Sequence, residues 1–187
     1  AILDAWTSLY AFGIDAGVDT LTSWMRAVSL CAPRIRGGQA LLIGETDPTL
    51  AQSLMLWNST LLAQTELRER EQTALPPVFA AACVWGRRDA VKVTLERIGA
   101  LGGGDLSAIE TTEGMLPSVL GPVPIPQPRT IDSRELEGTA DRVKAVVRVP
   151  QSRRGELALR LRSASARHVA AREPGELRFQ LDPKERI

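Results

Sequence analysis

Apolar side chains in the first 77 residues follow two patterns. Two segments place them at the period of a helix: 17–30 and a segment that opens at Asp47-Pro48. A third helix is expected over about 60–73 and ends in a charged stretch from Glu66 to Glu71. Aspartate at the N-cap and proline in the first turn both favour a helix start, and Pro33 ends the first helix. Residues 1–4 resemble the end of a strand, and 40–44 form a fully apolar run typical of a buried parallel strand. The order predicts part of an α/β layer, because two strands cannot form a complete covered sheet.

Residues 78–187 repeat a strand–helix–strand order on both sides of a proline-rich link. The predicted strands and helices lie at 78–85, 89–101, 115–120, 142–149, 153–171 and 177–181. The link at 117–128 holds five prolines, which favour an extended chain, and residues 130–140 are polar and predict a loop. Two βαβ units of this length are typical of a ferredoxin-like α+β sandwich. Its core is expected to include Val91, Leu95, Ile98, Val143, Val147, Leu157, Leu161 and Phe179.

The composition indicates a globular protein. Of the 187 residues, 44% are hydrophobic and 24% are charged, and the mean hydropathy is −0.06. No apolar run approaches the roughly 18 residues that span a bilayer, and no basic signal-peptide region opens the chain. We therefore expect a cytoplasmic protein with no membrane association. The strand-like start without methionine predicts a fragment or a processed chain.

Few residues in the chain are suited to metal or nucleophilic chemistry. Two cysteines, Cys31 and Cys83, and one histidine, His168, fall short of the about four ligands of a structural zinc site. We predict no catalytic, cofactor or metal residue in this chain. The glycines at 99–104 follow a helix rather than a strand, so they predict a helix end and a turn instead of a phosphate-binding loop. His168 lies among small apolar residues and is expected to be packed.

Basic and acidic residues are unevenly distributed along the chain, although the net charge is only +1. Residues 142–187 carry twelve basic and five acidic side chains, and arginine supplies 20 of the 23 basic residues in the chain. In the helix predicted at 153–171, Arg153, Arg160 and Arg167 recur every seven residues and form one stripe beside the apolar face. The stripe is either a solvated rim whose stems cover apolar surface or an edge that binds phosphates or acidic peptides.

Three motifs resemble the terminal region of the PriA family, also called primosomal protein N′. They are ELxxR followed by LPP at 66–77, LGPVP at 120–124, and LxFxLDP at 177–183. Their order and spacing match the family over about 60–183. The resemblance implies the last part of a RecA-like second helicase lobe over residues 1–77 and a PriA-like C-terminal domain over 78–187.

The resemblance also implies a function in replication restart at stalled forks. The family is usually an ATP-dependent 3′→5′ DNA helicase with zinc-binding cysteines and an N-terminal DNA-binding domain. No Walker A motif or cysteine cluster occurs in this chain, so zinc and ATP are implied only for the full-length protein. The implied partners are forked and single-stranded DNA, the acidic tail of single-stranded DNA-binding protein, and other primosome proteins.

One departure from the family concerns catalysis. Helicases of this type carry a QxxGRxGR segment before the strand at 40–44, and Leu30 and Pro33 occupy the positions of its two arginines. An arginine finger contributes about 10³–10⁵ in rate, and leucine supplies no charge. We therefore predict a degenerate lobe without helicase activity, similar to actinobacterial PriA-like proteins. The alternative is an active helicase that residues upstream of this chain complete.

The resemblance also indicates binding residues. Arg153 and Arg154 fall near the position of the family's tail-binding arginine, at a helix start whose N–H groups favour an anion, with Arg160 as support from the same stripe. DNA is expected to contact Arg142, Lys144 and Arg148, with strong salt dependence.

A third interpretation is an unrelated ferredoxin-like regulatory or RNA-binding domain. Such RNA-binding sheets display paired aromatic side chains for base stacking. The strand at 142–149 has no aromatic residue and the strand at 177–181 has only Phe179, which argues against this interpretation.

Overall fold

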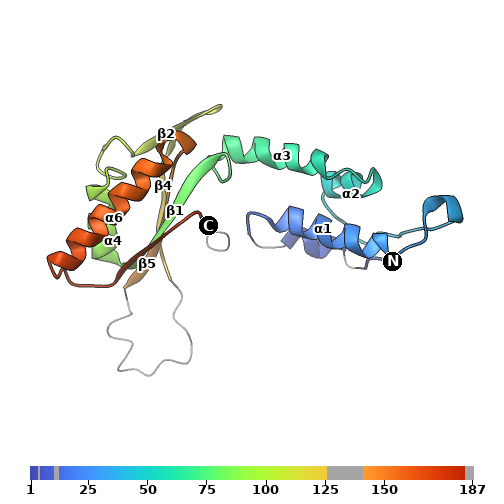
Figure 1. Ribbon diagram of the computed structural model, residues 1–187, viewed down its shortest axis with the longest axis horizontal. Helices are drawn as coiled ribbons and strands as arrows, with labels where there is room; N and C mark the ends of the chain where they lie inside the picture. The colour runs from blue at the N-terminus through green and yellow to red at the C-terminus, as the bar shows by residue number, and fades with distance from the viewer. Residues whose placement is uncertain (4, 11–12, 126–140, 184–187) are drawn as a thin grey trace, which may run out of the picture. The chain divides into compact units, whose positions relative to one another are not determined.

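The computed structural model describes residues 1–3, 5–10, 13–125 and 141–183. They form a mixed α/β structure that divides into two compact units, residues 1–69 and 70–187, each described by itself below (Figure 1). The loop expected at 130–140 lies outside the described residues. Within the described ranges, no helix is long and apolar enough to cross a membrane, and no three potential metal ligands come together.

The first unit is mainly helical. Its elements are η1 (Ala5–Tyr10), α1 (Ala16–Ser29), η2 (Arg34–Arg36), α2 (Pro48–Met55) and α3 (Ser59–Gln72), of which α3 continues into the second unit. As predicted, Asp47 caps α2, because its carboxylate accepts the backbone N–H groups of Thr49 and Leu50 at 2.8 and 3.0 Å. The buried core of this unit consists of Ala5, Leu21, Trp24, Leu50 and Leu62.

The buried strand predicted at 40–44 is wrong. Ile2 and Leu42 form one isolated parallel bridge, with the Ile43 N–H donating to the Ile2 carbonyl at 2.9 Å. Leu41 and Ile43 are 60% and 50% exposed. A buried parallel strand needs neighbouring strands and helices on both faces, and the described residues supply one short neighbour. The parallel pairing is present, but the predicted burial is not.

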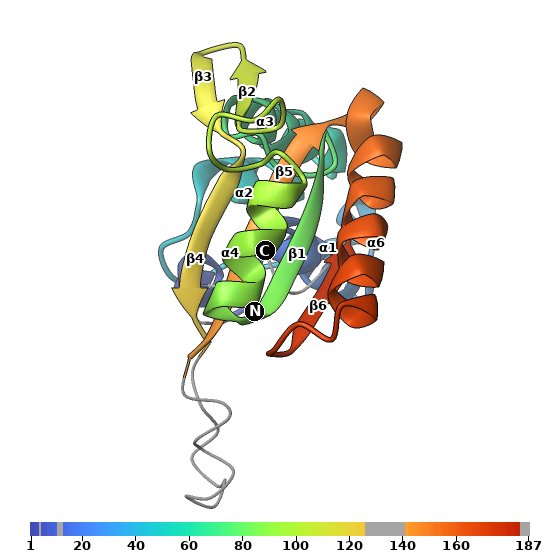
Figure 2. The same cartoon turned by 90° about the vertical axis from the view of Figure 1, so that its left-hand side faces the viewer.

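The second unit is built on a four-stranded antiparallel sheet. β1 (Phe79–Arg87), β4 (Val119–Pro124), β5 (Arg142–Pro150) and β6 (Leu177–Leu181) lie in the order β4-β5-β1-β6. α4 (Arg88–Arg97) and α6 (Arg154–Ala170) cover the same face of the sheet (Figure 2). The hairpin of β2 (Ala108–Thr111) and β3 (Gly114–Pro117) precedes β4, and η3 (Gln151–Arg153) leads into α6. A strand–helix–strand order is present in both halves, but β4, which closes the first half, lies inside the proline-rich link predicted at 117–128. The strand predicted at 115–120 spans the end of β3 and the start of β4.

The core lies between the sheet and the two helices. Alternate residues of β1 and β5 point to the helices, which is the period-two pattern of a strand with one face against a core. All eight predicted core residues belong to this cluster, Phe179 as a partly buried member; the others are Val91, Leu95, Ile98, Val143, Val147, Leu157 and Leu161. The apolar pattern therefore predicted correctly which helix faces meet the sheet.

The glycine-rich segment ends α4, as predicted. Gly99 has φ +77°, in the left-handed region that glycine adopts readily, and its carbonyl accepts the N–H of Leu106 at 2.9 Å. A side chain at Gly104 would meet the Gly99 backbone at 2.4–2.7 Å, so the turn closes tightly on itself. This turn leads into Asp105, which forms part of the site described next.

Candidate nucleic-acid and partner interface

The arginine stripe of α6 begins where η3 passes into the helix. Leu157, Leu161, Ala164 and His168 form the buried face of α6. Because Arg153 and Arg160 are seven residues apart, they lie on the same side of the helix, beside that buried face. Each is about one third exposed, with 32% and 31% of the side-chain surface accessible. Both side chains are therefore partly accessible beside the buried face of α6.

Arg153 and Arg160 converge on Asp105. The Arg153 Nη2 lies 2.5 Å from Asp105 Oδ2, and the Arg160 Nη1 and Nη2 lie 2.7 Å from Oδ1 and Oδ2. Arg153 also donates to the Asp105 backbone carbonyl at 2.8 Å. These hydrogen bonds, from Arg160 first and then Arg153, hold the pKa of Asp105 far below its usual range. The loop after α4 is thereby joined to α6.

Glu156 completes a network of two cations and two carboxylates. It accepts from Arg153 and from Arg160, at 2.7 and 2.5 Å, and the hydrogen bonds from Arg153 lower the pKa of Glu156 most. The formal charges cancel. An anionic ligand that used these two arginines would have to compete with Asp105 and Glu156.

Arg154 lies on a different side of α6. Its Nε and Nη2 both approach Asp182 Oδ2 at 2.7 Å, at the end of β6. Arg153 and Arg154 are adjacent in sequence and so point about 100° apart around the axis. Of the three predicted tail-binding residues, the structure brings Arg153 and Arg160 together and separates Arg154 from them.

The predicted DNA-binding residues lie on the face of the sheet away from the helices. Arg142 and Lys144 alternate along β5, and Lys144 is directly opposite Trp85, which is directly opposite Arg178. Directly opposite residues in antiparallel strands share a face of the sheet. Lys144, Trp85 and Arg178 therefore form a row across β5, β1 and β6. The side chain of Arg178 is 68% exposed. Glu176 pairs with Arg142 and with Arg178, at 2.8 Å in each case.

Arg148 lies on the same face but is buried, with 4% exposure. Its Nη1 donates to the carbonyl of Thr73 and its Nη2 to the carbonyl of Pro117, at 2.5 and 2.6 Å. Burial lowers the pKa of this guanidinium. The expectation that Arg148 contacts DNA is therefore at odds with its position, because almost none of the side chain can be reached by a phosphate.

The sequence did not predict a groove that lies between α4 and α6. We call it the α4–α6 groove. It has a volume of about 240 Å³. Its lining residues are Arg97, Leu159, Arg160, Ser163, Ala164 and Arg167. The helical period identified Arg160 and Arg167, but no sequence signal indicated that Arg97 of α4 would lie beside them.

Arg97 is held by the segment that follows α6. Its Nη1 and Nη2 donate to the two carboxylate oxygens of Glu173 at 2.8 and 2.5 Å. Glu173 Oε2 also lies 3.1 Å from His168 Nδ1, and His168 Nε2 lies 2.9 Å from the Gly175 carbonyl. The prediction that His168 is packed is confirmed, since it is 6% exposed.

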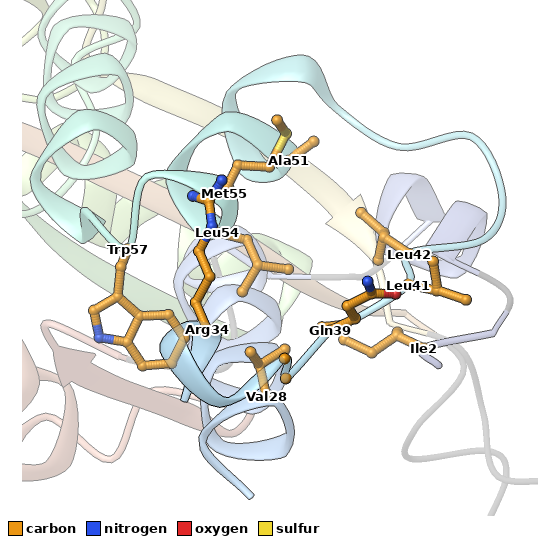
Figure 3. A pocket seen from close by; sticks show the side chains of 13 residues that line it. Ile2, Val28, Arg34, Gln39, Leu41, Leu42, Ala51, Leu54, Met55 and Trp57 are labelled. Atoms are coloured by element: carbon orange, nitrogen blue, oxygen red, sulfur yellow. The ribbon is translucent and has the colours of Figure 1, made fainter. Parts of the chain in front are cut away.

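The first unit contains a larger pocket of about 700 Å³ (Figure 3). Arg34 and Trp57 lie at one end of it, and Leu41 and Leu42 lie at the other. Leu30, at the end of α1, is 88% exposed. Apart from Arg34, the side chains that line the pocket are uncharged and mostly apolar, so the pocket has no cluster of cations for a triphosphate.

Comparisons with known proteins agree with the three sequence motifs. Residues 71–184 match the family described as Primosomal protein N C-terminal domain. The chain is 31% identical over 189 residues to the probable replication restart protein PriA of Mycobacterium leprae (strain TN), covering 97% of this chain and 26% of that protein. It is 29% identical over 186 residues to the protein of the same description from Mycobacterium tuberculosis (strain CDC 1551 / Oshkosh), covering 97% of this chain and 27% of that protein. The chain thus spans about a quarter of the length of these relatives.

The family match extends from the end of α3 through β6 and covers more than half of the chain. It includes both helices of the second unit and the whole four-stranded sheet. The chain therefore belongs to the primosomal protein N C-terminal domain family and corresponds to the C-terminal region of PriA.

Proposed function

We propose that the chain acts in replication restart, as the part of a PriA protein that binds DNA at stalled forks and recruits primosome partners. The observation that carries this proposal is the family match over residues 71–184 together with relatives that align over 97% of the chain. Both relatives are described as replication restart proteins. The basic residues of the second unit supply surfaces suited to anionic partners.

The proposed DNA surface is the row of Lys144, Trp85 and Arg178, extended by Arg142. Two cations flank an aromatic ring in this row. Cations on a sheet attract the phosphate backbone, and aromatic rings stack on the bases of single strands. We leave Arg148 out of this surface because it is buried.

The proposed site for the tail of single-stranded DNA-binding protein lies on α6. Arg153 and Arg160 offer paired guanidinium groups for carboxylates, and Arg154 offers a third on another side of the helix. The tail would replace Asp105 as the anion that these two arginines bind. Arg153→Ala combined with Arg160→Ala should then weaken tail binding, whereas Lys144→Ala combined with Arg178→Ala should weaken DNA binding more.

We also propose the two domain assignments that the family resemblance implies, and features of the fold support them. The antiparallel order β4-β5-β1-β6, with α4 and α6 on one face, supports a ferredoxin-like C-terminal domain over 78–187. The parallel bridge between Ile2 and Leu42, with helices around it, supports a partial RecA-like lobe over 1–77. Limited proteolysis that leaves a stable fragment starting near Pro77 would support the boundary, and rapid loss of that fragment would contradict it.

We propose no catalytic role for this chain, since Leu30 and Pro33 occupy the positions expected for arginines. Zinc and ATP would belong to other parts of the full-length protein. DNA-stimulated ATPase activity of the full-length protein tests this proposal, with Leu30→Arg and Pro33→Arg as companion variants. Robust activity in the unmodified protein would favour the alternative, an active 3′→5′ helicase.

The experiment that tests the function uses the full-length protein in cells that lack their own restart protein. Lys144→Glu combined with Arg178→Glu should fail to restore growth after replication forks are arrested. Arg162→Glu reverses the charge of an exposed residue on α6. This variant should restore growth when it is expressed at the same level. Full restoration by the double variant would contradict the proposed DNA surface.

A further inference from the structure

His168 lies where α6 passes into the segment that leads to β6. Its side chain belongs to the buried face of α6 and is 6% exposed. Its Nδ1 lies 3.1 Å from Glu173 Oε2, and its Nε2 lies 2.9 Å from the carbonyl oxygen of Gly175. Both distances are those of hydrogen bonds. Each ring nitrogen therefore faces one oxygen of the segment between α6 and β6.

Neither of these two oxygens can supply a proton. A backbone carbonyl accepts hydrogen bonds and has no proton to donate, and an ionised carboxylate is also an acceptor alone. Hydrogen bonds from Arg97, and to a lesser extent from His168, lower the pKa of Glu173 to about 2, so its carboxylate is ionised at neutral pH. A neutral imidazole has one N–H, which leaves the lone pair of its other nitrogen against an oxygen. The imidazolium, in contrast, donates to both oxygens.

The charges around the ring have opposite effects on its proton. Arg97 donates to both oxygens of the Glu173 carboxylate, at 2.8 and 2.5 Å, and its positive charge opposes an imidazolium. The carboxylate favours an imidazolium, and it dominates because it is in direct contact with the ring. On the side of β1, a side chain at Gly175 would lie 2.8 Å from the Cβ of Arg87, whose guanidinium pairs with Asp89.

The segment that His168 contacts aligns an edge strand. In the described sheet, β6 is at the edge and pairs with β1. Arg154 binds Asp182 just after β6, and His168 binds Glu173 and Gly175 just before it. Both anchors come from α6, one from its first turn and one from its last. The anchor before β6 is the one that depends on a proton.

We propose that His168 is a proton-dependent clasp, which as an imidazolium holds the segment between α6 and β6 and which releases one of its two contacts when it loses a proton. Histidine changes charge near neutral pH, so the start of β6 becomes sensitive to pH in that range. The ion pair between Arg97 and Glu173 persists when the proton is lost. The expected change is therefore a local loosening of the strand rather than unfolding of the domain.

The direction of the pH dependence follows from the two contacts. An unfolded chain has neither contact, and its histidine loses the proton near pH 6.5, as is usual for this side chain. The folded chain holds the same proton in the hydrogen bonds to Glu173 and Gly175. The stabilisation by the clasp is then fully present below about pH 6.5 and is lost as pH rises above it.

Nuclear magnetic resonance of the ring nitrogens tests the proposal directly. The 187-residue chain has one histidine, so histidine labelled with ¹⁵N reports a single imidazole. At pH 7 we expect a proton on each nitrogen of the wild-type ring and two similar ¹⁵N shifts. A ring with one protonated and one bare nitrogen at this pH would overturn the proposal, and this measurement requires no variant.

Two variants should move the titration of the ring in opposite directions. Glu173→Gln removes the attracting charge and should lower the titration midpoint by about one pH unit, which is a tenfold change in proton binding. Arg97→Gln removes the opposing charge and should raise the midpoint. Glu110→Gln, an exposed change on β2, is the control and should leave the midpoint unchanged. An unchanged midpoint in Glu173→Gln would show that the carboxylate does not hold the proton.

Stability and hydrogen exchange test whether the proton acts as a clasp. The urea midpoint of wild type should fall more between pH 6 and pH 8.5 than that of His168→Gln, whose side chain does not titrate in this range. The Arg87 N–H, which donates to the Glu176 carbonyl before β6, should exchange at least about fivefold faster at pH 8.5 after correction for intrinsic exchange. The Arg148 N–H, which donates to the Ser118 carbonyl, should not. Equal acceleration at both amides, or equal pH dependence of the two proteins, would overturn the clasp.

Discussion

Asp105 and Arg160 form a two-point ion pair, with Nη1–Oδ1 and Nη2–Oδ2 distances of 2.7 Å. The same carboxylate accepts from Arg153, so one residue of the loop after α4 binds two residues of the arginine stripe. An acidic peptide bound as proposed would place a carboxylate where Asp105 lies. Arg153 and Arg160 are thus neither a free anion site nor an unpaired rim.

Removing the charge of Asp105 should therefore raise affinity for an acidic peptide. Asp105→Asn leaves Arg153 and Arg160 with one competing carboxylate, Glu156, in place of two. We expect the dissociation constant of an acidic peptide to fall about 3–10-fold at low salt. Asp89→Asn is the control, since the ion pair that the described residues give Asp89 is with Arg87. Weaker binding by Asp105→Asn would show that Asp105 holds the arginines in a binding geometry.

Glu176 should limit the affinity of the chain for DNA. It is shared by Arg142 and Arg178, which lie on the proposed DNA surface. Glu176→Gln should strengthen binding to forked DNA about 2–5-fold at 50 mM salt, and less at 200 mM, because salt screens exposed charges. Glu96→Gln on α4 makes the same charge change at an exposed position away from this surface. An equal gain in both variants would mean that only net charge matters.

Arg148 should contribute to stability rather than to DNA binding. Arg148→Met leaves the carbonyls of Thr73 and Pro117 without their donors in a buried place. Each unsatisfied buried group costs about 1–3 kcal/mol, so the loss of two donors should lower the free energy of unfolding by about 2–6 kcal/mol. Urea unfolding measures this change, with Arg162→Met as the exposed control. A variant as stable as wild type would contradict the role assigned to Arg148.

Glu173 should add stability that disappears in acid. Hydrogen bonds from Arg97, and to a lesser extent from His168, lower the pKa of Glu173 from 4.5 to about 2. A carboxylate with a lowered pKa stabilises the folded state above its ordinary pKa, and that contribution is lost as pH falls from 4.5 to about 2. Wild type should therefore exceed Glu173→Gln in urea midpoint at pH 6, and the difference should shrink at pH 3. A difference that is the same at both pH values would show that the ion pair is not the cause.

Local patterns predicted much of the fold. The period of apolar residues identified α1, α4 and α6, because each of these helices buries one face, whereas α3 buries only Leu62. The N-cap of α2 was predicted from Asp47 and Pro48. The apolar run at 40–44 was misjudged because burial of a strand depends on its neighbours rather than on its own sequence. Trp85, near the end of β1, is an aromatic residue of this sheet outside the two strands on which the RNA-binding interpretation depends.

The site was less predictable because its partners are distant in sequence. The alternating pattern of β5 predicts that Arg148 is exposed to solvent. Arg148 is buried instead, and its hydrogen-bond partners lie 75 and 31 residues away in the sequence. Asp105 is 48 residues from Arg153, and Asp182 is 28 residues from Arg154. A helical stripe identifies which arginines share a side of α6, but it cannot identify the carboxylates that neutralise them.

The central claim, that this chain binds forked DNA through the sheet face of its second unit, is tested most directly by equilibrium binding. Anisotropy of labelled forked DNA is measured with the 187-residue chain and with Lys144→Glu combined with Arg178→Glu, from 50 to 200 mM salt. We predict affinity that falls linearly with the logarithm of salt, a loss of at least about tenfold in the double variant, and a shallower salt slope. A wild-type chain that does not bind forked DNA, or a double variant that binds it as tightly as wild type, would contradict the claim.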